Sequence, residues 1–108
     1  MFVTKYRHPV LTGKVKDVVY ERIHYVADQR GFHILKINGE SDHVHILMEA
    51  DTTTSPAELA NVLKTQTARK ARKLYGETIL KKYYWKPYFW SDSYFISSVS
   101  ENSLHTIK

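Results

Sequence analysis

The chain has 108 residues, no cysteine and a formal net charge of +5. This length fits one domain over residues 1–108, and the lack of cysteine excludes disulfides and thiolate metal sites, as is typical of a reducing interior. No apolar run is long enough to span a membrane and no signal peptide opens the sequence, so we expect a cytoplasmic protein without a membrane partner.

The first half of the chain predicts a strand, a helix and a β-hairpin. Residues 1–6 are typical of a short strand, and a helix follows that Gly31 is well placed to stop. Residues 32–37 are rich in strand formers, and Asn38-Gly39 is a dipeptide typical of hairpin turns, with a loop that could extend through Asp42. The apolar positions of the expected helix are Val15, Val18, Val19, Ile23 and Val26.

The second half predicts a capped helix and a last strand. Ser55-Pro56-Ala57-Glu58 combines an N-cap, a proline at the first helical position and a capping-box glutamate, which indicates a helix running to about Tyr75. A short helical piece is expected over residues 77–82, a strand over 93–99 and the first turn of another helix over 100–108. The residues of the long helix expected toward the core are Leu59, Val62, Leu63, Ala71 and Leu74.

Positive charge is concentrated between residues 61 and 90. That stretch holds eight basic side chains against Glu77 alone, whereas residues 1–60 hold seven basic against eight acidic side chains. The basic stretch ends in six aromatic residues between positions 83 and 90. Cations neutralise phosphates and aromatic rings stack on unpaired bases, so the pattern favours a nucleic-acid partner over a solvated helix face followed by core aromatics.

The segment Asp42-His43-Val44-His45-Ile46-Leu47 is typical of a strand in which two histidines alternate with aliphatic residues. Because strand side chains alternate between faces, the aliphatic residues would face the core and the two imidazoles would lie about 7 Å apart on the other face. His43 and His45 then suit one divalent metal, with water and phosphate as its remaining ligands. A His-x-His pair also occurs as ordinary surface histidines, so the motif needs support from elsewhere.

The expected order of elements is β-α-β-β-α-β, which predicts an α+β fold of the ferredoxin-like or RRM-like type. Such a domain has an antiparallel sheet with its helices on one face and the other face open. His43 and His45 would lie on the open face or at its border.

Five motifs in order resemble those of the small single-tyrosine HUH transposases of insertion-sequence-200-like elements. The resemblance covers nearly the whole chain. The family patterns are T/V-K-Y-R, D-H-V-H-[LI]-L, L-K-x-x-x-A-R, W-S-x-S-Y-[FV] and the approach to a last helix. The matching segments here are Thr4-Lys5-Tyr6-Arg7, Asp42-His43-Val44-His45-Ile46-Leu47, Leu63-Lys64 with Ala68-Arg69, Trp90-Ser91-Asp92-Ser93-Tyr94-Phe95 and Val99-Ser100-Glu101-Asn102.

The resemblance implies a metal-dependent DNA strand transferase. His43 and His45 would bind Mg²⁺ or Mn²⁺, which polarises a scissile phosphate of single-stranded DNA, and a tyrosine hydroxyl would attack it to form a 5′-phosphotyrosine. The family recognises hairpin-bearing single strands and acts as a homodimer. The residues expected to bind DNA are Lys5, Arg7, Lys64, Arg69, Arg72 and Lys73.

The family's nucleophile does not map onto these residues. Its pattern continues past the position of Lys108 into K-Y-I-x-x-Q, which holds the tyrosine and a third metal ligand, and it has several residues before Phe2. Tyr94 lies in a motif that the family has in addition to its nucleophile, which favours a structural role. Tyr94, Tyr88 and Tyr84 remain the candidate substitutes, and we expect the 108 residues as written not to cleave DNA.

Two other classes of protein fit parts of the pattern. A non-catalytic binder of hairpins or single strands would keep the fold and the basic helix, with or without the metal site. A generic RRM-like RNA module should show stacking aromatic residues on its central strands, and the histidine strand has none.

Overall fold

The computed structural model describes residues 1–50 and 55–94. The predicted α+β class and β-α-β-β-α-β order are confirmed, with two short 3₁₀ helices between the main elements. The elements are β1 (Phe2–Thr4), η1 (Lys5–Arg7), α1 (Gly13–Gln29), β2 (Phe32–Glu40), β3 (His43–Ala50), α2 (Pro56–Tyr75), η2 (Leu80–Lys82) and β4 (Trp90–Tyr94).

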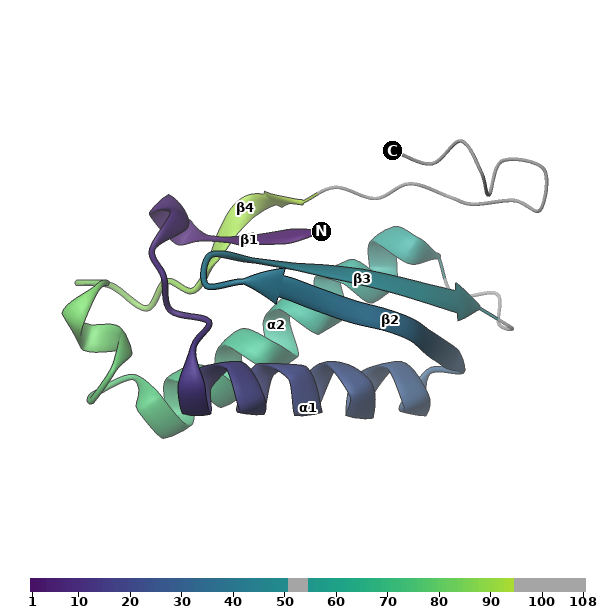
Figure 1. Cartoon of the computed structure of the whole chain (residues 1–108), viewed down its shortest axis with the longest axis horizontal. Coiled ribbons are helices and arrows are strands. Elements are labelled where there is room, and N and C mark those ends of the chain that lie inside the picture. Colours follow the sequence, from purple (N-terminus) through teal and green to yellow (C-terminus); the bar gives the residue numbers. More distant parts are fainter. Residues whose placement is uncertain (51–54, 95–108) are drawn as a thin grey trace.

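The four strands form one antiparallel sheet in the order β2-β3-β1-β4. Helices α1 and α2 both lie on one side of this sheet (Figure 1). Each β-α-β crossover joins two strands that have one strand between them, which is the split arrangement of ferredoxin-like domains. The histidine strand β3 therefore lies inside the sheet, between β2 and β1.

The helices begin and end where local chemistry predicts. Ser55 Oγ accepts a hydrogen bond from the backbone N–H of Glu58 at 3.1 Å, beside a proline at the start of α2. Gly31 follows the end of α1 with φ 77°, a left-handed conformation that costs glycine little because it has no Cβ. The predicted start of α2 and end of α1 are thus confirmed.

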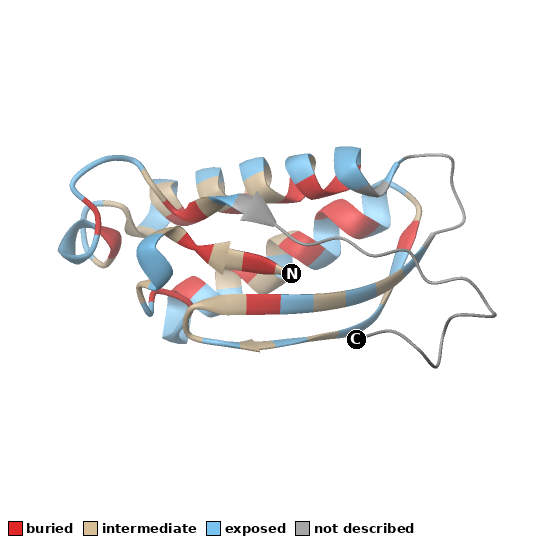
Figure 2. Cartoon of the chain, turned by 90° about the horizontal axis from the view of Figure 1, so that it is seen from above, coloured by how far each residue is buried: buried red, intermediate tan, exposed pale blue. Residues whose placement is uncertain are grey.

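The core lies between the sheet and the two helices (Figure 2). Val44 of β3 is fully buried there, so the strand is held against the helices through its aliphatic side chains. Each such side chain contributes roughly 1.5–3 kcal/mol on burial. Among the described residues, the largest aliphatic side chains that are fully buried are Val10, Val15, Val19, Ile23, Val44, Leu63 and Leu80.

A β-bulge at Leu35 keeps the isoleucines of β2 on one face. The register between β2 and β3 shifts by one residue between Ile34 and Lys36. Without the extra residue, Ile34 and Ile37 would point to opposite faces, because strand side chains alternate. Both isoleucines pack against the core, whereas Leu35 is exposed.

The hairpin turn lies at Ser41-Asp42, and the prediction of a turn at Asn38-Gly39 is wrong. Strand β2 continues through this dipeptide, and Gly39 pairs directly with Val44. The glycine is needed there for the close approach of two strands rather than for a turn.

Three further bounds differ from prediction. Strand β1 ends at Thr4, because residues 5–7 turn into η1. The short helical piece is η2 alone, beginning at Leu80. Strand β4 begins at Trp90, three residues before the predicted start, and includes residues 93 and 94. The rest of the predicted strand, over 95–99, and the predicted turn over 100–108 lie outside the described residues.

Leu74 is 46% exposed, so its predicted core position is wrong. Tyr75, four residues after the buried Ala71, packs against the core instead, since residues four apart lie on the same face of a helix. Among the described residues, no helix is both long enough and apolar enough to cross a membrane.

Candidate metal and nucleic-acid site

Strand β3 presents His43 and His45 on the face of the sheet opposite the helices. Val44 is buried, and Ile46 and Met48 are partly buried against the core. His45 is exposed and His43 is half-buried. The alternation predicted for this strand is observed.

The two histidine rings lie close enough to share an ion. Their centroids are 5.2 Å apart with the ring planes at 86°. Two imidazoles on one metal have centroids roughly 4.5–5.5 Å apart, given a metal–nitrogen bond of about 2.1 Å. Partial burial of its ring lowers the pKa of His45, and the neighbouring charge of His43 lowers it further, which favours the neutral form that binds metals.

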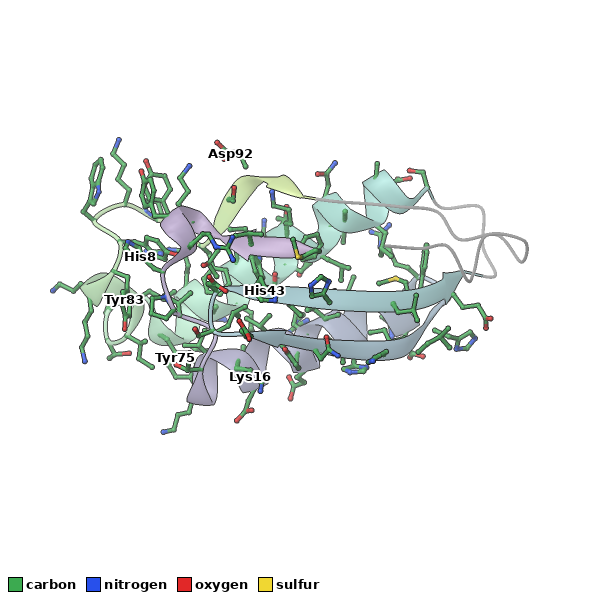
Figure 3. All side chains as sticks on the ribbon, turned by 45° about the horizontal axis from the view of Figure 1, so that its top comes forward. His8, Lys16, His43, Tyr75, Tyr83 and Asp92 are labelled. Carbon is green, nitrogen blue, oxygen red and sulfur yellow. The ribbon has the colours of Figure 1, made fainter. Side chains whose placement is uncertain are left out.

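Asp42 contacts one of these histidines directly. Its Oδ1 lies 2.9 Å from Nδ1 of His43, and its Oδ2 accepts a hydrogen bond from Nε of Arg7 at 3.0 Å (Figure 3 labels His43). The hydrogen bond with His43 and then that with Arg7 lower the pKa of the Asp42 carboxyl. Asp42 is therefore an ionised acceptor at neutral pH.

A second carboxylate lies across the hairpin. Glu40 pairs with His43 in the β2–β3 register, and ligand atoms of Glu40, Asp42 and His43 all lie within 4.8 Å of one another. Both oxygens of Asp42 are engaged by His43 and Arg7, whereas Glu40 is exposed. His45 is not part of this close group and adjoins it through the ring of His43. Imidazole nitrogens and carboxylate oxygens are both donors that suit a divalent cation.

The six cations expected to bind DNA fall into two groups. Arg7, Arg69 and Lys73 are exposed. Lys5, Lys64 and Arg72 are half-buried and have partners within the protein. The first group presents more of its charge to solvent, although Arg7 also forms an ion pair with Asp42 at 3.0 Å.

Lys64 and Arg72 hold β4 and the segment before it against α2. Nζ of Lys64 donates to the carbonyl of Ser91 at 2.7 Å, and Nη1 of Arg72 donates to the carbonyl of Tyr88 at 2.8 Å. Burial lowers the pKa of Lys64. Lys5 Nζ forms an ion pair with the exposed Asp92 at 3.5 Å. These side chains have structural contacts that the sequence did not predict.

An aromatic cluster gathers beside these cations at one end of the molecule (Figure 3 labels His8 and Tyr83). Each ring lies within 6.2 Å of another, centroid to centroid. Lys5 Nζ lies 4.9 Å from the centroid of Tyr88, and Lys86 Nζ lies 4.7 Å from that of Trp85. The cluster consists of Tyr6, His8, Tyr83, Tyr84, Trp85 and Tyr88.

Parts of this cluster remain open to solvent. Trp85 is 74% exposed and Tyr6 is 58% exposed. An open groove of about 300 Å³ runs between α2 and the segment leading into β4, with Lys64 and Tyr88 in its lining. A second, of about 190 Å³, has Arg72 and Trp85 in its lining. Cations and aromatic rings therefore border both grooves.

The candidate substitute nucleophiles lie in different surroundings. Tyr84 is buried, its hydroxyl donates to the carbonyl of Lys5 at 2.8 Å, and burial raises its pKa to about 12, all of which oppose nucleophilic attack. Tyr88 packs on neighbouring rings of the cluster. The backbone register sets Tyr94 opposite Phe2 at the end of β4.

Sequence reasoning did not identify Asp42 and Glu40 as site residues. Asp42 immediately precedes His43, and an acidic residue next to a candidate ligand is a signal that could have drawn attention. Glu40 could not be paired with His43 while the turn was expected at Asn38-Gly39, because that turn gives a different register.

Comparisons with known proteins show the family to which the chain belongs. The family model for IS200-like transposases matches residues 1–108. The chain is 33% identical over 103 residues to the ISDra2 transposase TnpA of Deinococcus radiodurans, covering 95% of this chain and 72% of that protein. It is also similar to a crystal structure of a Deinococcus radiodurans R1 protein assigned as a transposase, with a TM-score of 0.79, 28% identity and coverage of 97% of this chain and 79% of that one. The chain therefore belongs to the family of IS200-like transposases.

Proposed function

We propose that this transposase domain takes part in cutting and rejoining single-stranded DNA at hairpin-bearing element ends through a phosphotyrosine intermediate, with Mg²⁺ or Mn²⁺ at His43 and His45 and with the family's tyrosine, which does not map onto these residues, as the nucleophile. One observation carries the proposal. The two imidazoles lie 5.2 Å apart on the solvent face of a strand whose other face is anchored in the core. An anchored strand holds ligands with little reorganisation.

Metal binding and phosphate orientation would be carried out by different residues. His43 and His45 would hold the metal, and the nearby carboxylate of Glu40 could complete the protein ligands. When bound, the metal would supply charge that polarises the scissile phosphate. Arg7, which is exposed and adjoins Asp42, would orient a phosphate of the same strand.

The DNA surface would extend from the histidines toward the aromatic cluster. Arg69 and Lys73 on α2 would neutralise phosphates, and Trp85 and Tyr6 would stack on unpaired bases. Trp85, with Lys86 over its ring, suits a single strand. Every base offers a face on which an aromatic ring can stack, and the cation can neutralise a phosphate. A hairpin offers such bases at its loop and at its junction with the single strand.

A second copy of the chain is the expected protein partner. Strands β2 and β4 are the edges of the described sheet, and an edge strand leaves backbone donors and acceptors that another strand can pair with. A homodimer about a two-fold axis would satisfy them. Light scattering at tens of micromolar would contradict this part of the proposal if only monomer were present.

Metal titration tests the site. Mn²⁺ binding measured by electron paramagnetic resonance should be lost in His43→Ala and in His45→Ala. His24→Ala, which removes an exposed histidine from α1, is the matched control and should bind like the wild type. Unchanged Mn²⁺ affinity in both strand variants would refute the site.

A non-catalytic hairpin binder is the second candidate. The described ring contacts of the aromatic cluster include neither His43 nor His45, so this surface could bind bases without a metal. The two candidates differ in covalent chemistry. A protein–DNA adduct on a denaturing gel, formed with a labelled hairpin substrate and Mn²⁺, supports the strand transferase. Hairpin binding that persists in a metal chelator without any adduct supports the binder.

A further inference from the structure

Asp42 joins Arg7 to His43 by two side-chain contacts. Its Oδ1 lies 2.9 Å from His43 Nδ1, and its Oδ2 lies 3.0 Å from Arg7 Nε. The carboxylate therefore has one oxygen on each neighbour. Arg7 and Asp42 are 35 positions apart in sequence, so only the fold brings them together.

The contact decides which nitrogen of His43 carries the proton. An ionised carboxylate is only an acceptor, so a hydrogen bond to Nδ1 requires that Nδ1 carry hydrogen. In the neutral ring Nε2 is then the nitrogen with a free lone pair. This is the atom through which His43 would bind a metal, with Asp42 behind the ring.

The backbone of Asp42 is also fixed. Its carbonyl accepts hydrogen bonds from the N–H of Thr4 at 2.9 Å and from the Thr4 hydroxyl at 3.2 Å. The neighbouring Ser41 carbonyl accepts one from the N–H of Leu11 at 2.9 Å. The hairpin turn is thus tied to β1 and to the segment before α1, which fixes the backbone from which the carboxylate extends.

Arg7 reaches Asp42 from a strained turn. Tyr6 and Arg7 have φ of 58° and 54°, a left-handed conformation that costs a non-glycine residue roughly 1–2 kcal/mol. Neighbouring contacts offset this cost, including the hydrogen bond from the Thr4 hydroxyl to the His8 carbonyl at 2.7 Å. Strain of this kind persists where the surrounding structure holds a side chain in a required place.

We propose that Asp42, held by Arg7, is a positioning residue that fixes the ring and tautomer of His43 so that Nε2 is offered to the metal. The proposal rests on the function proposed above, because it assigns His43 as a ligand. Outer contacts of this type commonly change metal affinity by roughly 10- to 100-fold when removed. Arg7 acts through Asp42 and should have a smaller effect.

Nuclear magnetic resonance on the metal-free chain tests the tautomer directly. At about pH 8, above the ordinary histidine pKa of about 6.5, long-range ¹H–¹⁵N spectra should show His43 with hydrogen on Nδ1. Asp42→Ala should move the population toward hydrogen on Nε2. Asp42→Asn has one acceptor oxygen for two donors and should restore the wild-type tautomer only in part. Asp28→Ala, which removes an exposed carboxylate from α1, should leave His43 unchanged.

Mn²⁺ titration of the same variants completes the test. We expect affinity to fall roughly 10- to 100-fold in Asp42→Ala, less in Arg7→Gln, and not at all in Asp28→Ala. An unchanged His43 tautomer in Asp42→Ala would overturn the proposal, even with weaker Mn²⁺ binding, because Asp42 would then be a ligand itself. If the wild-type chain binds no Mn²⁺, the proposed function fails, while the spectra still decide whether Asp42 fixes the ring.

Discussion

The Cα atom of Val44 lies so close to Gly39 on the neighbouring strand that a Cβ built on the glycine would be 2.8 Å from it. The same Cβ would collide with the carbonyl oxygen of His43. Both contacts are with backbone, which cannot turn aside as a flexible side chain can. This pair therefore sets the separation of β2 and β3 where the histidine motif begins.

Gly39→Ala should destabilise the protein by about 1–3 kcal/mol, because the added methyl forces the two strands apart. The free energy of unfolding can be measured by urea denaturation followed by circular dichroism. Asn38→Ala, at the exposed neighbouring position, is the control and should change stability by less than about 0.5 kcal/mol. Equal stabilities for the two variants would show that the hairpin has room for the methyl.

Thr67→Val should also destabilise the fold. The Thr67 hydroxyl accepts a hydrogen bond from Trp90 Nε1 at 2.8 Å in the core, so valine leaves a buried indole N–H unsatisfied at a cost of about 1–3 kcal/mol. Adding Trp90→Phe removes the orphaned donor, and the penalty of Thr67→Val should shrink in that background. Thr65→Val, on the exposed face of α2, is the control. A full penalty in the Trp90→Phe background would contradict the assigned bond.

Tyr84 should make stability sensitive to alkaline pH. Burial raises its pKa to about 12 in the folded chain, above the ordinary tyrosine value of about 10. The folded state thus favours the neutral phenol, and this contribution is complete below pH 10 and lost as the pH rises toward 12. The stability advantage of the wild type over Tyr84→Phe should therefore shrink across this range. Tyr25→Phe, an exposed position, should follow the wild type.

Substitutions of the exposed cations and of the cations bonded to backbone carbonyls should have different effects on DNA affinity and on the free energy of unfolding. Arg69→Gln and Lys73→Gln should weaken binding to a hairpin-bearing single strand and lower the log–log salt slope by roughly 0.7–0.9 per lost phosphate contact, without destabilising the fold. Lys64→Gln and Arg72→Gln should also lower the unfolding free energy, because each removes a hydrogen bond to a backbone carbonyl. Lys14→Gln on α1 is the control for net charge. A salt slope that drops as much in this control would argue for nonspecific attraction.

Trp85→Ala should weaken single-strand binding by about 1–3 kcal/mol, the usual effect of losing one stacked base. Its ring is 74% exposed, so the substitution should leave stability nearly unchanged. Tyr25→Ala removes an aromatic ring that is 55% exposed on α1 and serves as the matched control. Fluorescence anisotropy with a labelled hairpin measures both. Equal losses of affinity would exclude a stacking role specific to Trp85.

Much of the fold could be predicted because its signals are local. The Ser55 cap, the stop at Gly31 and the alternation of His43, Val44 and His45 each depend on neighbours within a few residues. The order of these signals is sufficient to define β-α-β-β-α-β, and the motifs they contain carry the family resemblance that the comparisons confirm.

The site required the tertiary structure. Asn38-Gly39 has the composition of a turn, yet backbone contact with β3 rather than local preference decides its conformation. Lys64 and Arg72 find their acceptors 27 and 16 positions away.

By itself, the sequence determined the elements, their order and the two histidines on one face, because caps and strand alternation act over a few residues. Only the tertiary structure decided which cations stay exposed. It also decided that Arg7 donates a hydrogen bond to Asp42, whose other oxygen contacts His43. The reason is physical: a hydrogen bond between distant residues exists only after the strands and helices have packed, and packing depends on the whole core at once.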